Sequence, residues 1–186
     1  MTASRALPKL ADLSDTDVVI RVRGVPRGAE TLERTIRRMQ DVLDLPGVLE
    51  VTKEIVSRHG FADRITFLPG DYHAAEFGSG YDAALLSGMM HREPPSGCQQ
   101  LLHKAFAALE PGGLAVVSDV FFDDDSRTSP PFATYFAINM MLMSEHGSAH
   151  AKTEMASWMR AAGFTQVEVR DLPPPNPHSL VLGIRP

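Results

Sequence analysis

Four polar side chains follow short apolar runs of the sequence, and their types are those that bind hydroxyl groups or transfer protons. Asp44, Asp71 and His91 come after the runs VL, ITFLPG and YDAALLSGMM, and Asp119 lies near the end of LAVVSDVFF. A carboxylate offers two acceptor oxygens to a ligand, and an imidazole titrates near neutral pH. If the apolar runs are parallel strands, these residues gather at the carboxyl edge of the sheet, where such sheets bind their ligands.

Each of these residues also has a purely structural interpretation. Asp is common in turns and at helix starts beside proline and glycine, which applies to Asp44 and Asp71. A histidine at the mouth of a strand, such as His91, is often an ordinary polar residue. Local sequence therefore leaves both interpretations open.

Several other polar residues are expected to take no part in chemistry. The run Asp123–Asp125 has no cation-ligand spacing and is typical of a solvated turn. His146 and His150 flank a Gly-Ser loop, so we expect both at the surface. Cys98 falls within a predicted helix and is expected to be inert.

The period of the apolar residues predicts strands that alternate with helices. Strands are expected at residues 18–22, 42–47, 65–71, 81–88, 114–122, 165–171 and 179–184, and helices at 29–39, 47–60, 96–113 and 153–163. Alternation implies crossover connections and a parallel sheet. The short PPPNP loop lets the last two strands pair as antiparallel neighbours. The sequence therefore predicts an α/β fold, with a Rossmann-like, doubly wound, mostly parallel sheet and a C-terminal antiparallel hairpin.

Composition limits the classes of protein to consider. The 186 residues, 44% of them hydrophobic, suit one domain at 17–186 after a lead-in at 1–16. The net charge of −5 and the scattered Lys and Arg residues predict neither nucleic acid nor membrane as a partner. One cysteine, no signal peptide and no bilayer-length apolar run favour a cytoplasmic protein. A small-molecule partner is expected.

From about Leu43 to the C-terminus, the chain resembles the class I S-adenosylmethionine-dependent O-methyltransferases of the plant caffeate and bacterial polyketide type. The resemblance rests on the ordered segments DLPGVLE, ITFLPGDYH, YDAALLSGMMHREPP, ALEPGGLAVVSDV, FAINMML and KTEMASWMRAAGF. Each segment alone is common, but their order and spacing make the match specific. The resemblance implies S-adenosylmethionine as cofactor, no metal, and a small hydroxylated acceptor that is aromatic or a polyketide.

The resemblance also implies which residues bind the cofactor. Asp44 corresponds to the acid that binds the ribose hydroxyls, and Asp71 and Tyr72 correspond to the pair that flanks the adenine. The remaining cofactor-binding residues assigned in this way are Ser87, Gly24 and Gly28.

On the acceptor side, His91 corresponds to the general base, which takes the hydroxyl proton as the methyl group moves. Asp119 and Glu154 correspond to acids that orient this histidine or its substrate. The acceptor-binding residues implied are Asn139, Met140 and Met143, on a helix that lines the acceptor pocket. Flexible thioethers there would pack on an aromatic ring, although methionines also suit a core and the asparagine suits a local cap.

The glycine-rich turn departs from the family pattern. Family members end the first strand with an acid, followed by glycines that let the backbone approach the cofactor closely. Here the stretch is RVRGVPRG, with Arg21 or Arg23 in place of the acid, and Pro26 removes a backbone donor. We therefore expect a locally altered segment over about residues 20–42.

Two functions from different classes are consistent with these features. The first is an O-methyltransferase, and the second is a non-catalytic methyltransferase-like binding module or remnant with impaired cofactor binding. Family members also carry a helical segment ahead of the cofactor domain, through which they dimerise. Because only residues 1–17 precede the first predicted strand, we expect a cofactor domain alone, and a homodimer is left open.

Overall fold

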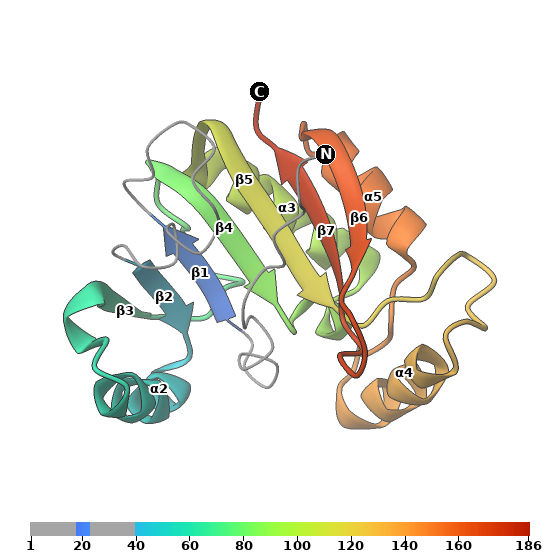
Figure 1. Ribbon diagram of the computed structural model, residues 1–186, viewed down its shortest axis with the longest axis horizontal. Coiled ribbons are helices and arrows are strands. Elements are labelled where there is room, and N and C mark those ends of the chain that lie inside the picture. The colour runs from blue at the N-terminus through green and yellow to red at the C-terminus, as the bar shows by residue number, and fades with distance from the viewer. Residues whose placement is uncertain (1–17, 23–39) are drawn as a thin grey trace.

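A seven-stranded sheet forms the centre of the computed structural model, which describes residues 18–22 and 40–186 (Figure 1). Its strands are β1 (Val18–Val22), β2 (Gln40–Asp44), β3 (Ile65–Pro69), β4 (Tyr81–Ser87), β5 (Leu109–Asp119), β6 (Thr165–Asp171) and β7 (Ser179–Ile184). They lie in the order β3-β2-β1-β4-β5-β7-β6. The predicted helix at 29–39 lies outside the described residues.

Proline begins three of the four long helices among the described residues. The long helices are α2 (Pro46–Arg58), α3 (Pro95–Ala108), α4 (Pro131–Met143) and α5 (Lys152–Ala161), and the short 3-10 turns are η2 (Ala62–Arg64) and η3 (Met90–Arg92). Proline opens α2, α3 and α4, where its fixed φ suits the first turn and its missing N–H leaves no bond unmade. The prediction that α3 extends to residue 113 is wrong, because Leu109–Gly113 belong to β5.

The sheet is mixed, and this corrects the expectation of a mostly parallel one. β2 pairs with β3 and β4 with β5 in parallel, whereas β1 runs antiparallel to both β2 and β4. Figure 1 shows the β1 arrow opposed to its neighbours, as is that of β7. An apolar strand satisfies its backbone hydrogen bonds in either sense, so its composition does not encode direction.

The C-terminal hairpin is confirmed. β6 and β7 have the predicted bounds and pair antiparallel, from Thr165 opposite Ile184 to Asp171 opposite Ser179. β7 also pairs antiparallel with β5 and so joins the hairpin to the rest of the sheet.

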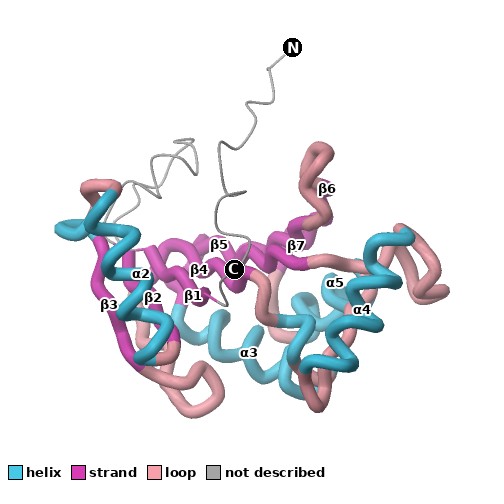
Figure 2. The backbone as a smooth tube through the Cα atoms, turned by 90° about the horizontal axis from the view of Figure 1, so that it is seen from below, coloured by secondary structure: helices cyan, strands magenta, loops and turns pink. Residues whose placement is uncertain are grey.

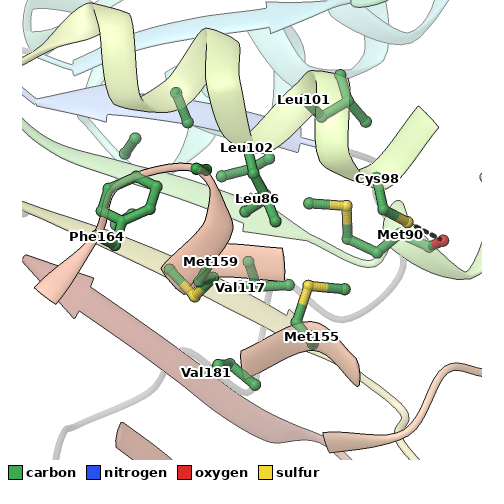
Figure 3. Packing of buried hydrophobic residues seen from close by; sticks show 14 of the residues in the cluster. Leu86, Met90, Cys98, Leu101, Leu102, Val117, Met155, Met159, Phe164 and Val181 are labelled. Carbon is green, nitrogen blue, oxygen red and sulfur yellow. Dashed lines mark hydrogen bonds between the residues drawn. The ribbon is translucent and has the colours of Figure 1, made fainter. Parts of the chain in front are cut away.

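Alternate residues of the central strands bury against different faces of the sheet. Leu86 and Val117 belong to the main core, which α3 and α5 cover (Figures 2 and 3). Ala83 and Leu85 pack on the opposite face with Leu49 of α2. This alternation follows the period of two along a strand and accounts for the nearly continuous apolar composition of β4 and β5.

Helix α4 lies beyond the edge of the sheet at which β4 and β5 end (Figure 1). It contacts η3, and its exposed side includes Tyr135, Leu142 and Met143. Within the described ranges, no helix is long and apolar enough to cross a membrane.

Candidate active site

His91 and Asp119 form a buried pair at the carboxyl edge of the sheet. His91 lies in η3, just after β4, and Asp119 is the last residue of β5. The His91 Nδ1 atom lies 2.8 Å from Asp119 Oδ1, and the backbone N–H of His91 donates to Asp119 Oδ2 at 3.2 Å. Both residues are at most 9% exposed. Since a carboxylate only accepts, this geometry places the imidazole proton on Nδ1 and a lone pair on Nε2.

Helix α4 supplies the apolar neighbour of this pair. The Phe136 ring meets the His91 ring edge-on, with 4.9 Å between centroids and 82° between planes. Phe132, one turn earlier, stacks on Phe136 at 6.3 Å. Sequence reasoning missed Phe136, although its position in the FAINMML segment was available as a signal.

Asp44 ends β2 and is only 6% exposed. Its Oδ1 accepts from the backbone N–H of Leu45 at 2.7 Å, while its Oδ2 is buried and has no hydrogen-bond partner among the described residues. Burial raises the pKa of the Asp44 carboxyl above its usual range, and the Leu45 N–H and the Arg92 charge only partly oppose this. A buried carboxylate oxygen without a partner is typical of a site that a hydroxyl-bearing ligand completes.

Asp71 and Tyr72 lie in the loop after β3, near Asp44. The Gly70 N–H donates to the Asp44 carbonyl at 3.0 Å, and exposed Asp71 accepts from the His73 N–H at 2.8 Å. The Tyr72 hydroxyl donates to Glu93 Oε1 at 2.8 Å. This buried glutamate, which the sequence analysis missed, links the loop after β3 to the turn that carries His91.

Lys104 of α3 holds the same loop from the other side. Its Nζ donates to the carbonyls of Tyr72, His73 and Ala75 at 3.0, 2.6 and 3.1 Å. One ammonium group therefore satisfies a run of loop carbonyls and fixes the backbone around the predicted adenine-binding pair.

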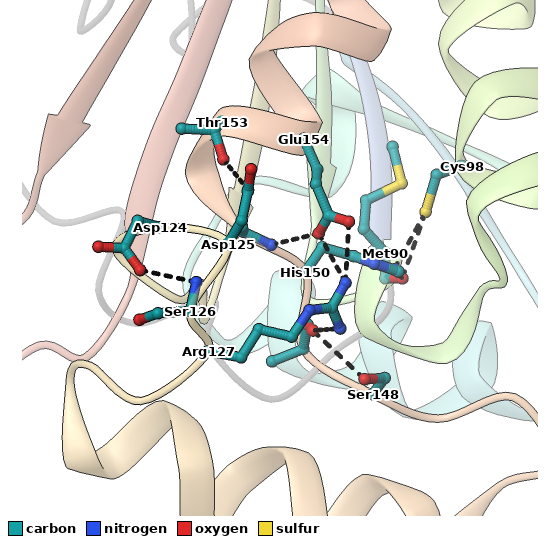
Figure 4. Close-up of polar contacts among 12 residues, drawn as sticks. Met90, Cys98, Asp124, Asp125, Ser126, Arg127, Ser148, His150, Thr153 and Glu154 are labelled. Atoms are coloured by element: carbon teal, nitrogen blue, oxygen red, sulfur yellow. Dashed lines mark hydrogen bonds and ion pairs between the residues drawn. The ribbon is translucent and has the colours of Figure 1, made fainter.

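The structure places Glu154 at the start of α5, in contact with Arg127 (Figure 4). Its two oxygens accept from Arg127 Nη2 at 2.8 and 2.9 Å, and Oε2 also accepts from the Ala151 N–H at 2.8 Å. The bond from the Ala151 N–H caps the helix. Asp119, and not Glu154, is the carboxylate hydrogen-bonded to His91, so an orienting role for Glu154 stays a prediction.

The predicted acceptor residues lie on α4, largely in the open. Asn139 and Met143 are exposed and Met140 is partly buried, so the alternative that these methionines belong to the core does not hold. Helix α4 contacts His91 through Phe136, one turn before Asn139 and Met140.

Of the remaining predicted cofactor-binding residues, the structure describes only one. Ser87 is buried at the end of β4 and pairs in register with Ser118, whereas Gly24 and Gly28 lie outside the described residues. The direction of β1 matters for these glycines. Val22, at the end of β1, pairs with Gln40 and Ala83, near the starts of β2 and β4. The strand before the glycines thus ends at the edge of the sheet opposite to Asp44 and Ser87.

The predicted positions of the remaining polar residues are confirmed, apart from that of His150, whereas the expectation that they take no part in chemistry stays a prediction. Asp123–Asp125 and His146 are exposed, and Cys98 is buried within α3, where burial raises the pKa of its thiol well above the usual range. The prediction for His150 is wrong: it is 3% exposed. A Gly-Ser loop suggested a surface position, but the following segment enters the core behind η3. Within the described residues, no group of acidic, histidine and cysteine side chains is arranged to hold a metal.

Comparison with known proteins agrees with this arrangement. A family model described as the O-methyltransferase domain matches residues 34–165. This chain belongs to the O-methyltransferase domain family. The resemblance to class I S-adenosylmethionine-dependent O-methyltransferases is thereby confirmed.

Individual members of the O-methyltransferase domain family match over a similar range. The 3-hydroxy-5-methyl-1-naphthoate 3-O-methyltransferase of Streptomyces sahachiroi is 31% identical over 144 residues, covering 77% of this chain and 41% of the relative. The acetylserotonin O-methyltransferase of Gallus gallus is 30% identical, covering 69% of this chain and 36% of the relative. This chain thus spans about two fifths of the length of these relatives.

A solved structure supports the same assignment. The apo S-adenosylmethionine-dependent methyltransferase SibL matches with a TM-score of 0.70 at 34% identity, covering 78% of this chain and 43% of SibL. An O-methyltransferase family protein from Burkholderia thailandensis has a TM-score of 0.72 at 23% identity, over 83% of this chain and 46% of the other, and shows the shared fold.

Proposed function

We propose that this chain is the cofactor-binding and catalytic domain of an S-adenosylmethionine-dependent O-methyltransferase that modifies a hydroxyl group on a small aromatic or polyketide acceptor. The observation that carries the proposal is the buried His91–Asp119 pair, joined at 2.8 Å where two parallel strands end. Ligands of doubly wound sheets bind at this edge. A histidine held by a carboxylate there is suited to remove a hydroxyl proton.

His91 acts as the general base through Nε2. Asp119 accepts the Nδ1 hydrogen bond and so keeps the lone pair on the other nitrogen, which takes the proton of the acceptor hydroxyl as its oxygen is methylated. Such proton transfer typically contributes about 10²- to 10⁴-fold in rate. Most of the remaining acceleration comes from holding the reactants in line.

Asp44 provides the main support for the cofactor. Its unpartnered Oδ2 suits a ribose hydroxyl, and its other oxygen is already occupied by the Leu45 N–H. Asp71, Tyr72 and Ser87 complete this side of the proposed site. When bound, S-adenosylmethionine supplies the methyl group.

Helix α4 and the named relatives support an aromatic or polyketide acceptor. Phe136 presents an aromatic surface beside the base, and Asn139, Met140 and Met143 extend the proposed acceptor surface along the helix. The Streptomyces sahachiroi relative is named for a hydroxynaphthoate, which makes a hydroxynaphthoate a suitable first acceptor to test.

The reversed β1 favours a second candidate, a methyltransferase-like module that binds its ligand poorly and has no activity. In that case the acceptor side is retained, but β1 ends at the edge of the sheet opposite to Asp44. Loss of cofactor binding, with the fold intact, is the signature of this candidate.

Titration calorimetry with S-adenosylhomocysteine, followed by a transfer assay with a hydroxynaphthoate, tests the proposal. We expect micromolar binding that Asp44→Ala weakens and the exposed control Asp63→Ala leaves unchanged. Mass spectrometry should find one added methyl group, and NMR should place it on oxygen. No heat from a sample with an intact circular dichroism spectrum would instead support the inactive module.

A further inference from the structure

One short segment behind the candidate site, residues 148–152, hydrogen-bonds to the turn that carries His91 and to Phe122, three residues after Asp119. It follows α4 and leads into α5, and His150 at its centre is buried. Both His91 and Asp119 are distant from this segment in the sequence. Its hydrogen bonds therefore join parts of the site that are far apart in sequence.

The first set of contacts holds residues 89–93, the His91 turn. The Ser148 N–H donates to the His91 carbonyl at 2.8 Å. His150 Nε2 lies 3.1 Å from the Met90 carbonyl (Figure 4) and 3.0 Å from the Glu93 carbonyl. Because carbonyls only accept, this nitrogen carries the proton and donates to both.

The second set of contacts holds the chain that leaves Asp119. The Phe122 N–H donates to the His150 carbonyl at 2.9 Å, and the Lys152 N–H donates to the Phe122 carbonyl at 3.0 Å. Phe122 and Ala151 thereby form a parallel bridge. His150 thus bonds to the His91 turn through its ring and to the Asp119 side through its backbone.

We infer that His150 is a positioning residue that fixes the His91 turn relative to Asp119. It thereby sets the hydrogen bond between His91 Nδ1 and Asp119. Its effect on catalysis rests on the proposed O-methyltransferase function. The His150 ring is locked edge-on against Trp158, with 5.1 Å between centroids, and its Nε2 also lies 3.4 Å from the Cys98 sulfur. In metal sites, residues that orient a ligating histidine typically change activity by about 10- to 100-fold when removed, and we expect an effect at the lower end of that range here.

A residue that serves only packing would be replaceable by any side chain of similar shape. The inferred role instead requires the N–H donor, because the Met90 and Glu93 carbonyls would otherwise lose the bond that this ring donates. The long Cys98 thiol contacts and, for Met90, the Glu93 N–H would be their remaining donors. His150→Phe keeps an aromatic ring without the donor, and His150→Gln keeps an N–H donor without the ring. His146→Phe is the matched control, since His146 is exposed in the same connection.

The first readout is ¹⁵N NMR of the histidine rings, which needs neither cofactor nor turnover. In the wild type, His150 should carry its proton on Nε2 and His91 on Nδ1. In His150→Phe, the His91 ring should lose this single tautomer, and His150→Gln should restore it. A wild-type His150 protonated on Nδ1 alone would overturn the inference without any variant, which covers the case in which His150→Phe does not fold.

The second readout is steady-state kinetics. In His150→Phe, kcat should fall at least tenfold, with the S-adenosylhomocysteine Kd within twofold of the wild type and substantial recovery in His150→Gln. Equal losses in the Phe and Gln variants, or a His91 tautomer unchanged in His150→Phe, would overturn the inference. Absence of turnover in the wild type would overturn the proposed function alone, because the NMR result decides the positioning role independently.

Discussion

The two halves of the candidate site are built differently. In the proposed acceptor half, which consists of His91, Asp119 and α4, the histidine is paired with a carboxylate, and its turn is bonded to a neighbouring segment. In the cofactor half, Asp44 and the loop of Asp71 and Tyr72, a buried carboxylate oxygen has no partner among the described residues. The protein itself thus orients the imidazole of the proposed acceptor half, whereas the proposed cofactor half leaves one hydrogen bond that a ligand can complete.

The largest effect that separates the halves is expected from His91→Ala. Loss of the base should lower kcat by about 10²- to 10⁴-fold, while the Kd for S-adenosylhomocysteine, set by the other half, stays within twofold. Transfer assays and calorimetry on the same preparation measure both quantities. Turnover equal to that of the wild type would remove His91 from the base role.

The halves also rest on different cores. Met159→Ala opens a cavity in the main core that extends to the His91 turn, and such truncations cost about 2–5 kcal/mol. Leu49→Ala acts in the small cluster with Val42 and Ala83 beneath Asp44. We expect a loss nearer the lower end of that range, because a small cluster beside the surface relaxes more readily. Urea denaturation of both variants gives the comparison, and a larger loss for Leu49→Ala would contradict it.

Ionised Asp44 should destabilise the protein without ligand. Its pKa is raised on folding, so the folded state binds more protons and the free energy of unfolding falls as pH rises from the ordinary carboxyl range through the raised value. Asp44→Asn should lack this fall and gain about 1 kcal/mol at neutral pH, because an unpartnered buried charge is removed.

Thermal denaturation at several pH values, with and without S-adenosylhomocysteine, tests this behaviour of Asp44. Saturating ligand should reverse the order, with the wild type more stable than Asp44→Asn. A wild type that remains less stable with ligand present would show that this carboxylate does not bind it.

The smallest effect is expected from Glu154→Gln. The pair with Arg127 is partly exposed, and such pairs contribute about 0.2–1 kcal/mol. We expect a small decrease in melting temperature, because the helix cap is weakened. The kcat should stay within threefold of the wild type. A tenfold fall in kcat with unchanged melting temperature would assign Glu154 the orienting role that the resemblance implies.

The sequence predicted local elements better than long-range contacts. The bounds of β6 and β7 were correct because strong apolar patterns and turn residues delimit them. The positions of His91 and Asp119 at strand ends followed from the same patterns. Their pairing spans 28 residues, and no local pattern carries such information. The burial of His150 was missed because the Gly-Ser sequence before it indicates a loop but says nothing about the core that the next residues enter.

The sequence by itself therefore determined the family, the order of the elements and the residue types at the carboxyl edge of the sheet, since these depend on period and spacing along the chain. Only the tertiary structure decided that β1 runs antiparallel and that Asp119 binds His91 while Glu154 binds Arg127. It also decided that His150 bonds both to the His91 turn and to Phe122. The period of a strand specifies which residues share a face. The sense of pairing and the partner of each polar atom depend on elements distant in the chain.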